Sequence, residues 1–226
     1  MATNHSTLNT HCVTVQLLQV PLRSPRDTSS RPWWTHLITS LQGVDGITKV
    51  VWASQHEDEK IQGIVICWDS RSAQKTWADS VEHTTWMSDI KSLATGPLCE
   101  DIVFLDESVN KVLGAQVVEI VSWIHPTSQI DGEKIRLLED GFLKFQKAIS
   151  NETSGVDGGL VAGLGQIEFV HQGVRCHRFT SLIGWKSVQT HYDCKATPAF
   201  MENIQWLTDQ NERDMEMVHY SFGGSS

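Results

Sequence analysis

The sequence predicts an α+β protein in which two βαββαβ repeats of one chain close together into a barrel. The first observation is a repeated helix segment, because WMSDIKSL at Trp86–Leu93 resembles FMENIQWL at Phe200–Leu207, 114 positions later. The second is a repeated strand end, because ICWDS at Ile66–Ser70 resembles IGWKS at Ile183–Ser187, 117 positions later. The difference of three positions predicts a short insertion between the two motifs of the first copy, where a helix-entry loop tolerates it.

The first copy shows the patterns of a strand, a helix, two strands, a helix and a strand, in that order. Its strands are rich in apolar and β-branched residues. Its first helix is expected to begin near Pro32 and to end at Gly43, and its second helix to break near Glu82–Thr85. The expected elements are a strand at 13–22, a helix at 31–46, strands at 47–55 and 60–68, a helix at 72–94 and a strand at 100–107.

The second copy repeats this order. Its first helix carries an apolar stripe, and Pro198 interrupts its second helix. The two copies predict domains at 12–110 and 114–222, joined at Asn110–Gly114, with residues 1–11 and the tail 223–226 expected to be disordered. The expected elements are a strand at 115–124, a helix at 131–150, strands at 159–171 and 174–185, a helix at 187–209 and a strand at 213–222.

The repeat explains how the chain could complete its own fold. A βαββαβ unit forms a four-stranded antiparallel sheet with both helices on one face, which leaves the other face bare. Two such sheets can pack face to face, so we expect a monomer or a homodimer of whole barrels. At matching strand ends, Trp68 and Trp185 are expected to be structural, and Ser70 and Ser187 to cap the helices that follow.

These motifs carry a resemblance to a known family. The pattern apolar-Gly/Cys-Trp-x-Ser, with a later helix ending aromatic-Met-x-x-Ile-x-x-Leu, resembles the dimeric α+β barrel superfamily of ferredoxin-like repeats. The likeness is to its antibiotic-biosynthesis monooxygenase-like branch, and the tandem arrangement over residues 12–222 is similar to fungal two-domain proteins. The resemblance implies an intrachain dimeric α+β barrel. Members include cofactor-free quinol and anthrone oxygenases, haem-degrading oxygenases, polyketide cyclases and stress-response proteins, and the fold does not choose among them.

Composition limits the kind of partner. The net charge of −9 and the pI of about 5.5 argue against nucleic acid and anionic membranes, which need clustered Lys and Arg. Five cysteines without a C-x-x-C pair, and no secretory pattern, indicate reduced thiols and a cytoplasmic location. No apolar run approaches the roughly 18 residues of a transmembrane helix. Nine Trp against two Tyr suggest that some Trp line a pocket, so a small hydrophobic molecule is the expected partner.

Titratable groups gather in the second copy. Strand alternation places Glu119 on an apolar face, where burial could raise its pKa and make it a general base, although an outward position or a buried ion pair is the alternative. We expect Glu119, His177 and His219 to be catalytic, with Glu119 and His177 as cross-strand neighbours. The expected substrate-binding residues are Trp123, Arg175, Phe179 and Met217 of the second copy and Trp34 and His36 of the first helix.

No cofactor is expected. The glycines of GVDGGLVAGLG fail the pattern G-x-G-x-x-G and precede a strand, so no nucleotide or flavin site is implied. A metal or haem would use His125, His171, His177 and His219, but nothing in their spacing demands either group.

The predicted function is cofactor-independent cyclisation or isomerisation of a hydrophobic polyketide- or terpenoid-like intermediate of secondary metabolism. Binding and orientation would supply much of the rate. The alternative on the same fold is a cofactor-free monooxygenase that acts on a phenol, anthrone or quinol. A further alternative is a stress-response or binding protein without catalysis.

Overall fold

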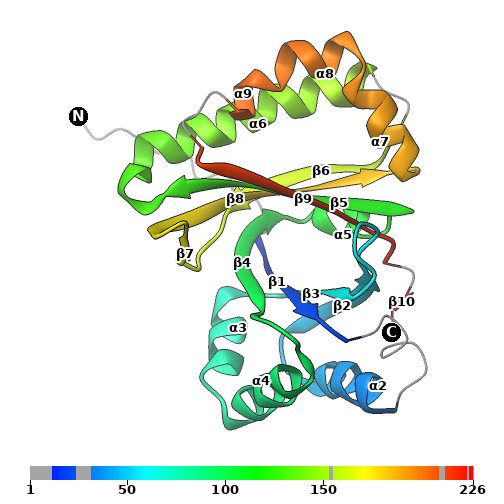
Figure 1. Ribbon diagram of the computed structural model, residues 1–226, viewed down its shortest axis with the longest axis vertical. Coiled ribbons are helices and arrows are strands. Elements are labelled where there is room, and N and C mark those ends of the chain that lie inside the picture. Colours follow the sequence, from blue (N-terminus) through cyan, green and yellow to red (C-terminus); the bar gives the residue numbers. More distant parts are fainter. Residues whose placement is uncertain (1–11, 24–31, 153–154, 209–211, 223, 226) are drawn as a thin grey trace.

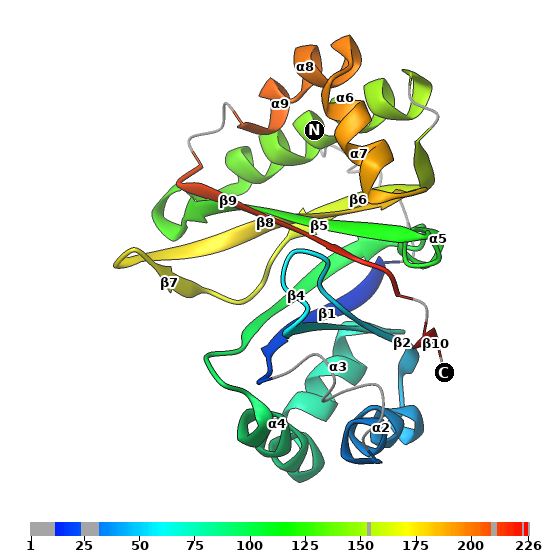
Figure 2. The same ribbon diagram turned by 45° about the vertical axis from the view of Figure 1, so that its right-hand side comes forward.

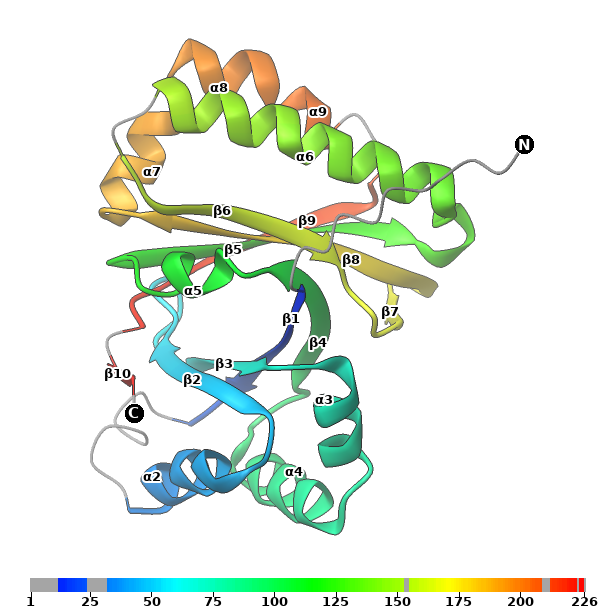
Figure 3. The same ribbon diagram turned by 180° about the vertical axis from the view of Figure 1, so that it is seen from behind.

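Two antiparallel sheets lie face to face in the middle of the molecule, and each carries its helices on its outer face (Figure 1). The view from behind shows the same four layers, with α2–α4 below one sheet and α6–α9 above the other (Figure 3). This computed structural model describes residues 12–23, 32–152, 155–208, 212–222 and 224–225. The predicted arm at residues 1–11 lies outside the described residues.

The first sheet has the strand order β10-β2-β3-β1-β4. Along the chain, its strands β1 to β4 and the helices between them follow the expected βαββαβ order. Only β10 comes from the end of the chain, and Figure 2 shows it beside β2. The elements of this half are β1 (Cys12–Pro21), α2 (Pro32–Thr39), the 3-10 turn η1 (Ser40–Gly43), β2 (Ile47–Ser54), β3 (Ile61–Trp68), α3 (Arg71–Ala78), α4 (Val81–Leu93) and β4 (Cys99–Asp106).

The second sheet has the order β6-β8-β5-β9, and β7 adds to β8. The central pair is therefore β5 and β8, as βαββαβ topology requires. The elements of this half are α5 (Val109–Val112), β5 (Val117–Pro126), the turn η2 (Thr127–Gln129), α6 (Gly132–Glu152), β6 (Val156–Leu164), β7 (Phe169–His171), β8 (Val174–Trp185), α7 (Val188–Lys195), α8 (Pro198–Asn203), α9 (Gln205–Thr208), β9 (Asp214–Tyr220) and β10 (Gly224–Ser225).

Three segments differ from the sequence-based expectation. The helix break in the first copy comes earlier, at Asp79–Ser80, because the Ser80 side chain accepts a hydrogen bond from the His83 backbone and starts α4. The strand expected at 159–171 ends at Leu164, and β7 then pairs separately with β8. The expectation of a disordered tail is wrong for Gly224–Ser225, because these residues pair with β2; Gly223 and Ser226 lie outside the described residues.

The two sheets are joined along both edges, which closes the barrel within one chain. On one side, the Gln166 backbone N–H donates to the Ile102 carbonyl at 2.8 Å, next to a bridge between Val103 and Gly165. On the other side, Gln55 forms an isolated antiparallel β-bridge with Tyr220, and the backbone N–H of His56 donates to the carbonyl of His219 at 2.9 Å. We call this second junction the β2–β9 seam. The expectation of an intrachain α+β barrel is confirmed.

An apolar cluster lies between each pair of adjacent layers. A central cluster contains residues of both sheets, such as Val65 and Leu182, while two outer clusters fill the spaces between each sheet and its helices. Trp68 and Trp185 are fully buried at equivalent strand ends. Ser70 and Ser187 accept hydrogen bonds from the first turns of α3 and α7, so their expected role as N-caps is confirmed. In the described part of the chain, no helix is both long and apolar enough to cross a membrane.

Candidate active site

A cavity of about 200 Å³ lies between the second sheet and its helices. Its walls are mostly aromatic and apolar, with Trp123 from β5, Trp185 from β8 and Phe200 from α8. Three titratable residues, Glu119, His191 and Lys195, also line it. An apolar space with a few convergent polar groups is the usual form of a small-molecule site.

Glu119 supplies a buried carboxylate in this cavity. Alternation along β5 points it toward the helices, and its residue surface is 4% exposed. The Trp185 indole N–H donates to Glu119 Oε2 at 2.8 Å. Burial raises the pKa of Glu119 to about 7, although the Trp185 hydrogen bond and the charge of Lys195 act in the opposite direction. A carboxyl group of this kind exchanges a proton near neutral pH.

His191 lies next to Glu119. Ser187 caps the N-terminus of α7, and His191 is the first residue of this helix that is buried against the sheet. Its ring lies against the ring of Trp185, with 5.0 Å between centroids. Its Nε2 is 3.6 Å from Glu119 Oε2, which is longer than a hydrogen bond. Burial, followed by the neighbouring His219, lowers the pKa of His191 to about 3, so this ring is neutral at physiological pH.

His219 and Glu57 extend the row of contacts from His191 to the β2–β9 seam. Nδ1 of His191 is 2.8 Å from Nε2 of His219. The β2–β9 seam brings Glu57, in the turn after β2, onto His219, whose backbone N–H donates to Glu57 Oε2 at 2.9 Å. His219 Nδ1 contacts Glu57 Oε1 at 2.5 Å. Burial raises the pKa of Glu57, but its hydrogen bonds with His219 outweigh this effect and the net pKa is lowered.

Donors and acceptors can be assigned along this chain of groups, which we call the Glu119–Glu57 relay (Glu119, His191, His219 and Glu57). Ionised Glu57 can only accept, so Nδ1 of His219 donates to it. In a neutral His219 ring, Nε2 then accepts from Nδ1–H of His191, and Nε2 of His191 is an acceptor that faces Glu119. Once the 3.6 Å separation between His191 Nε2 and Glu119 Oε2 closes to hydrogen-bond distance, a proton on Glu119 can pass to Glu57, whose side chain is 35% exposed.

The same groups could hold a metal ion. Glu119, His191 and His219 each offer a ligand atom, and these atoms lie within 4.8 Å of one another. Two imidazoles and a carboxylate suit a divalent transition metal, and Glu57 would act as the outer partner of His219. The facing nitrogens of the two histidines are only 2.8 Å apart, which fits a shared proton, so a cation would have to separate the rings.

The structure brings several predicted site residues together. Glu119, Trp123 and Met217 line the cavity, and His219 joins Glu119 through His191. Phe179 is buried behind Trp123, with 6.3 Å between ring centroids.

Other predicted site residues lie elsewhere. The expected cross-strand contact of Glu119 with His177 is wrong, because Glu119 pairs with Ile183 whereas His177 pairs with His125. His177 lies six positions from Ile183 along β8, or about 20 Å at 3.3 Å per residue. His177 Nδ1 instead contacts the Gly165 carbonyl at 3.1 Å.

Arg175 is exposed and forms an ion pair with Glu168 at 2.6 Å, outside the cavity. Trp34 is buried in the outer cluster of the first half, and His36 is exposed on α2. These three residues therefore lie away from Glu119. Sequence reasoning missed His191 and Glu57, and it gave Trp185 only a structural role.

Comparison with known structures supports the fold. No protein-family model and no curated protein sequence matches the chain. A proposed monooxygenase from Fusobacterium nucleatum is similar over 95% of this chain and 94% of its own, with 11% identity and a TM-score of 0.60. An anthrone oxidase-like protein is similar over 96% and 94%, with 13% identity and a TM-score of 0.63. A proposed monooxygenase from Lactobacillus acidophilus is similar over 95% and 98%, with 8% identity and a TM-score of 0.55. At these identities the likeness shows the shared two-domain α+β barrel fold.

Proposed function

We propose that the protein is a cofactor-independent enzyme that removes a proton from a hydrophobic, aromatic small molecule and lets the resulting carbanion react with O2. The observation that carries the proposal is a buried carboxyl group, Glu119, that faces an aromatic cavity and connects through two histidines to Glu57 at the surface. Activated phenols, anthrones and quinols are suitable substrates because their anions are stabilised by conjugation and can reduce O2.

The reaction balances without any added reductant. For an anthrone, ionised Glu119 takes one proton from the reactive CH2 group, and the carbanion transfers an electron to O2. The two radicals combine to form a C–O bond, and the resulting peroxide anion takes up the proton held by Glu119. The hydroperoxide then loses water, as the second C–H proton leaves with the outer oxygen as hydroxide. The CH2 group becomes a ketone, one oxygen atom enters the product, and the other leaves as water.

The surrounding residues support each step. Aromatic walls from Trp123, Trp185 and Phe200 can orient a flat ring and exclude water, which favours proton transfer over side reactions. Donation from the Trp185 indole keeps Glu119 in position and stabilises its ionised form. His191 and His219 can exchange protons between Glu119 and Glu57, so that Glu119 is ionised again for the next turnover.

One feature favours oxygenation over the cyclisation or isomerisation predicted from the sequence. Similarly folded proteins are described as proposed monooxygenases or as anthrone oxidase-like. The relay connects Glu119 with the surface residue Glu57, and either reaction could use it to exchange protons with the solvent. Isomerisation remains the second candidate, because Glu119 with a pKa of about 7 can also give the proton back.

The test is O2 uptake by the purified chain with an anthrone as substrate, with product identified by mass spectrometry under ¹⁸O2. We expect one labelled oxygen atom in the ketone, and a loss of about 100-fold or more in kcat for Glu119→Gln. Glu202→Gln, an exposed change of the same type on α8, is the matched control and should keep full activity. Conversion of substrate without O2 uptake would support the isomerase, and full activity of Glu119→Gln would remove the proposed base.

A second variant tests the relay. Glu57→Gln keeps the shape of the side chain but removes the acceptor charge, so we expect kcat to fall about tenfold while KM stays constant. Addition of zinc or iron(II) to metal-free protein provides the contrasting result. If turnover requires bound metal in stoichiometric amount, the histidines act as ligands and the proton relay is wrong.

A further inference from the structure

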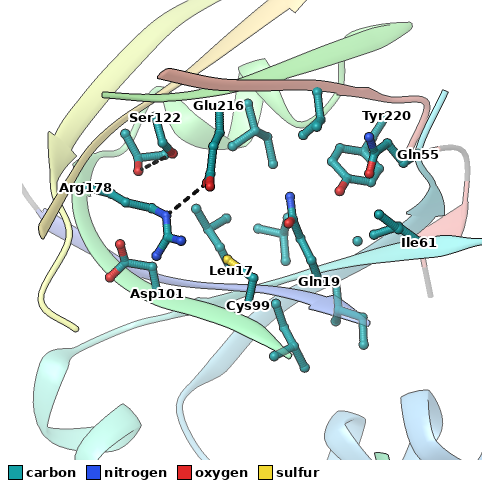
Figure 4. Close-up of a pocket in the computed structure, with 17 residues that line it drawn as sticks. Leu17, Gln19, Gln55, Ile61, Cys99, Asp101, Ser122, Arg178, Glu216 and Tyr220 are labelled. Carbon is teal, nitrogen blue, oxygen red and sulfur yellow. Dashed lines mark hydrogen bonds and ion pairs between the residues drawn. The ribbon is translucent and has the colours of Figure 1, made fainter. Parts of the chain in front are cut away.

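A second cavity, of about 270 Å³, lies between the two sheets inside the barrel (Figure 4). It is on the other face of the second sheet from the candidate active site. Alternation along β5 separates the two spaces, since Glu119 and Val121 face the helices whereas Ile120 and Ser122 face the barrel interior. The walls of this inter-sheet cavity come from both halves of the chain.

One end of the inter-sheet cavity is charged. Arg178 of β8 is 9% exposed, and its Nε donates to Glu216 Oε2 at 3.3 Å. Its guanidinium carbon lies 3.6 Å from the ring centroid of Phe169. Figure 4 shows the guanidinium between Asp101 and Glu216. Two carboxyl groups and one guanidinium give this end a net negative charge when both carboxyl groups are ionised.

Asp101 leaves one oxygen unpaired at this end. It is 3% exposed, and its Oδ1 accepts hydrogen bonds from the backbone N–H groups of Ile102 and Ile167 at 2.8 and 3.2 Å. Its buried Oδ2 has no hydrogen-bond partner among the described residues. Burial raises the pKa of Asp101 to about 6, so the carboxylate is ionised at pH 7 and above. A buried acceptor of this kind is costly without a donor.

The other end is neutral and also presents an acceptor. Gln55 is 6% exposed, and its Oε1 is buried without a hydrogen-bond partner among the described residues. The Tyr220 ring crosses from the second sheet toward Gly63, where an added Cβ would lie 2.5 Å from the ring. Figure 4 shows the Tyr220 hydroxyl and the Gln19 amide directed into the space. The middle of the cavity is apolar, with Leu17, Val65, Ile120 and Val218.

The polar groups at the two ends of the cavity and its apolar middle indicate the chemical class of its ligand. The unpaired acceptors, Asp101 Oδ2 and Gln55 Oε1, favour a ligand with an N–H or O–H donor at each end. The Tyr220 hydroxyl, unpaired in the described part of the chain, can donate to or accept from the group at the neutral end, and the negative end favours a cationic donor. The apolar middle suits a short methylene chain better than ordered water, which needs several polar partners. Glu216 and Tyr220 are four residues apart on β9, about 13 Å between Cα atoms, which limits the ligand to a short chain.

We propose that the inter-sheet cavity binds a short aliphatic α,ω-diamine or amino alcohol, with its ammonium group between Asp101 and Glu216 and its second donor at Gln55 and Tyr220. Glu216, whose side chain is 48% exposed, lies where the ligand can enter. The site is separate from the Glu119 cavity, so the proposal does not depend on the proposed oxygenase activity.

The test is NMR titration of the full chain, labelled at the isoleucine methyl groups, with 1,5-diaminopentane. Ile61, Ile64 and Ile120 line the inter-sheet cavity, whereas Ile183 and Ile204 line the Glu119 cavity and report on it separately. We expect saturable shifts of the first three methyl groups with a Kd of about 1 mM or lower. Pentan-1-ol, which lacks the cation, should bind at least tenfold more weakly.

Two variants locate the ligand. Glu216→Gln removes one charge from a half-exposed position that tolerates substitution, and it should weaken diamine binding by at least about fivefold. Glu202→Gln on α8 makes the same change in net charge elsewhere and should leave the Kd unchanged. Val218→Phe places a ring in the cavity and should abolish the shifts while the melting temperature shows that the protein remains folded.

The proposal is overturned by either of two results. One is the absence of saturable shifts at Ile61, Ile64 and Ile120 up to 10-fold above the expected Kd of about 1 mM, which would mean that the cavity holds only water. The other is equal binding of the diamine by the wild-type, Glu216→Gln and Val218→Phe proteins, which would place the ligand outside this cavity.

Discussion

At the scale of single residues, the two halves of the chain carry the same positions with different chemistry. Cross-strand register places Trp68 opposite Thr14 and Trp185 opposite Val117, so Gln16 corresponds to Glu119 two residues further along the strand. The offset of 117 aligns Gln74 of α3 with His191 of α7. All four side chains are buried. The first half therefore keeps neutral amides where the second half has a base and an imidazole, and the catalytic proposal rests on the second half.

The Trp185 indole should set the pH at which the proposed base works. Its N–H donates to the ionised oxygen of Glu119, and this hydrogen bond lowers a pKa that burial has raised. Trp185→Phe removes the donor and keeps an aromatic ring. We expect the acid limb of the kcat profile, near pH 7 in the wild-type protein, to move upward by about one pH unit. A limb that stays in place, in a variant that still turns over, would show that Glu119 is not the titrating group.

Burial of Glu119 should also make stability depend on pH. Its pKa is raised from 4.5 to about 7 on folding, so between these values the folded protein holds a proton that the unfolded chain has lost. The stability contribution is therefore present below pH 4.5 and is lost as pH rises through 7. Glu119→Gln lacks this dependence. The free energy of unfolding of the variant, relative to that of the wild-type protein, should therefore increase by about 3 kcal/mol between pH 4.5 and pH 8. Urea unfolding of both proteins at the two pH values measures the change, and a constant difference would contradict it.

At the scale of elements, local signals explain most of the secondary structure. Ser70 and Ser187 start their helices, and Pro198 begins α8, because side-chain caps and proline act within one turn. The break between α3 and α4 was predicted a few residues late, since Ser80 and the threonines that follow offer competing caps. Alternation correctly placed Glu119 and Trp123 on one face of β5, and Met217 and His219 on one face of β9. It did not say which face points toward the helices, and it does not specify register. Register is what separates His177 from Glu119.

Gly184 shows how closely β6 and the connection between α5 and β5 approach the end of β8. An added Cβ would lie within 3 Å of the Asp157 carbonyl oxygen and of the Ala115 side chain, and the backbone atom cannot move aside. We expect Gly184→Ala to lower the free energy of unfolding by about 3 kcal/mol or more, as overpacking of a rigid contact does. Gly43→Ala is the control, because an added Cβ there meets nothing within 4 Å. Thermal unfolding of the two variants should separate them clearly, and equal melting temperatures would mean that the β8 end is loosely packed.

At the scale of the whole molecule, the internal repeat was sufficient to predict two sheets that close on each other. It was not sufficient to predict Glu57 as part of the site. Glu57 lies in a polar turn of the first half, and only the β2–β9 seam brings it to His219, 162 positions later in the chain. Contacts of this range depend on how two sheets dock, and neither periodicity nor motif spacing carries that information. His191 could have been identified from the sequence, because the offset of 117 between the two copies aligns it with Gln74.

The seam also predicts how the two halves depend on each other. We propose that residues 12–110 and 114–222 are separate structural domains, and that neither is complete alone, because the central cluster is built from both sheets. Two co-expressed chains, 1–107 and 108–226, keep α5 whole, with the buried Val112 and Leu113, in the second half. We expect them to purify as a complex with one copy of each, by gel filtration with light scattering, and the intact chain to behave as one barrel or as a pair of whole barrels.

Because Glu57 and Glu119 lie on different chains, a first half that carries Glu57→Gln should assemble normally with a wild-type second half and lower kcat by the same factor as in the intact protein. Recovery of two stable halves that do not associate, with an active second half, would show that the barrel does not need both sheets and that the relay ends before Glu57.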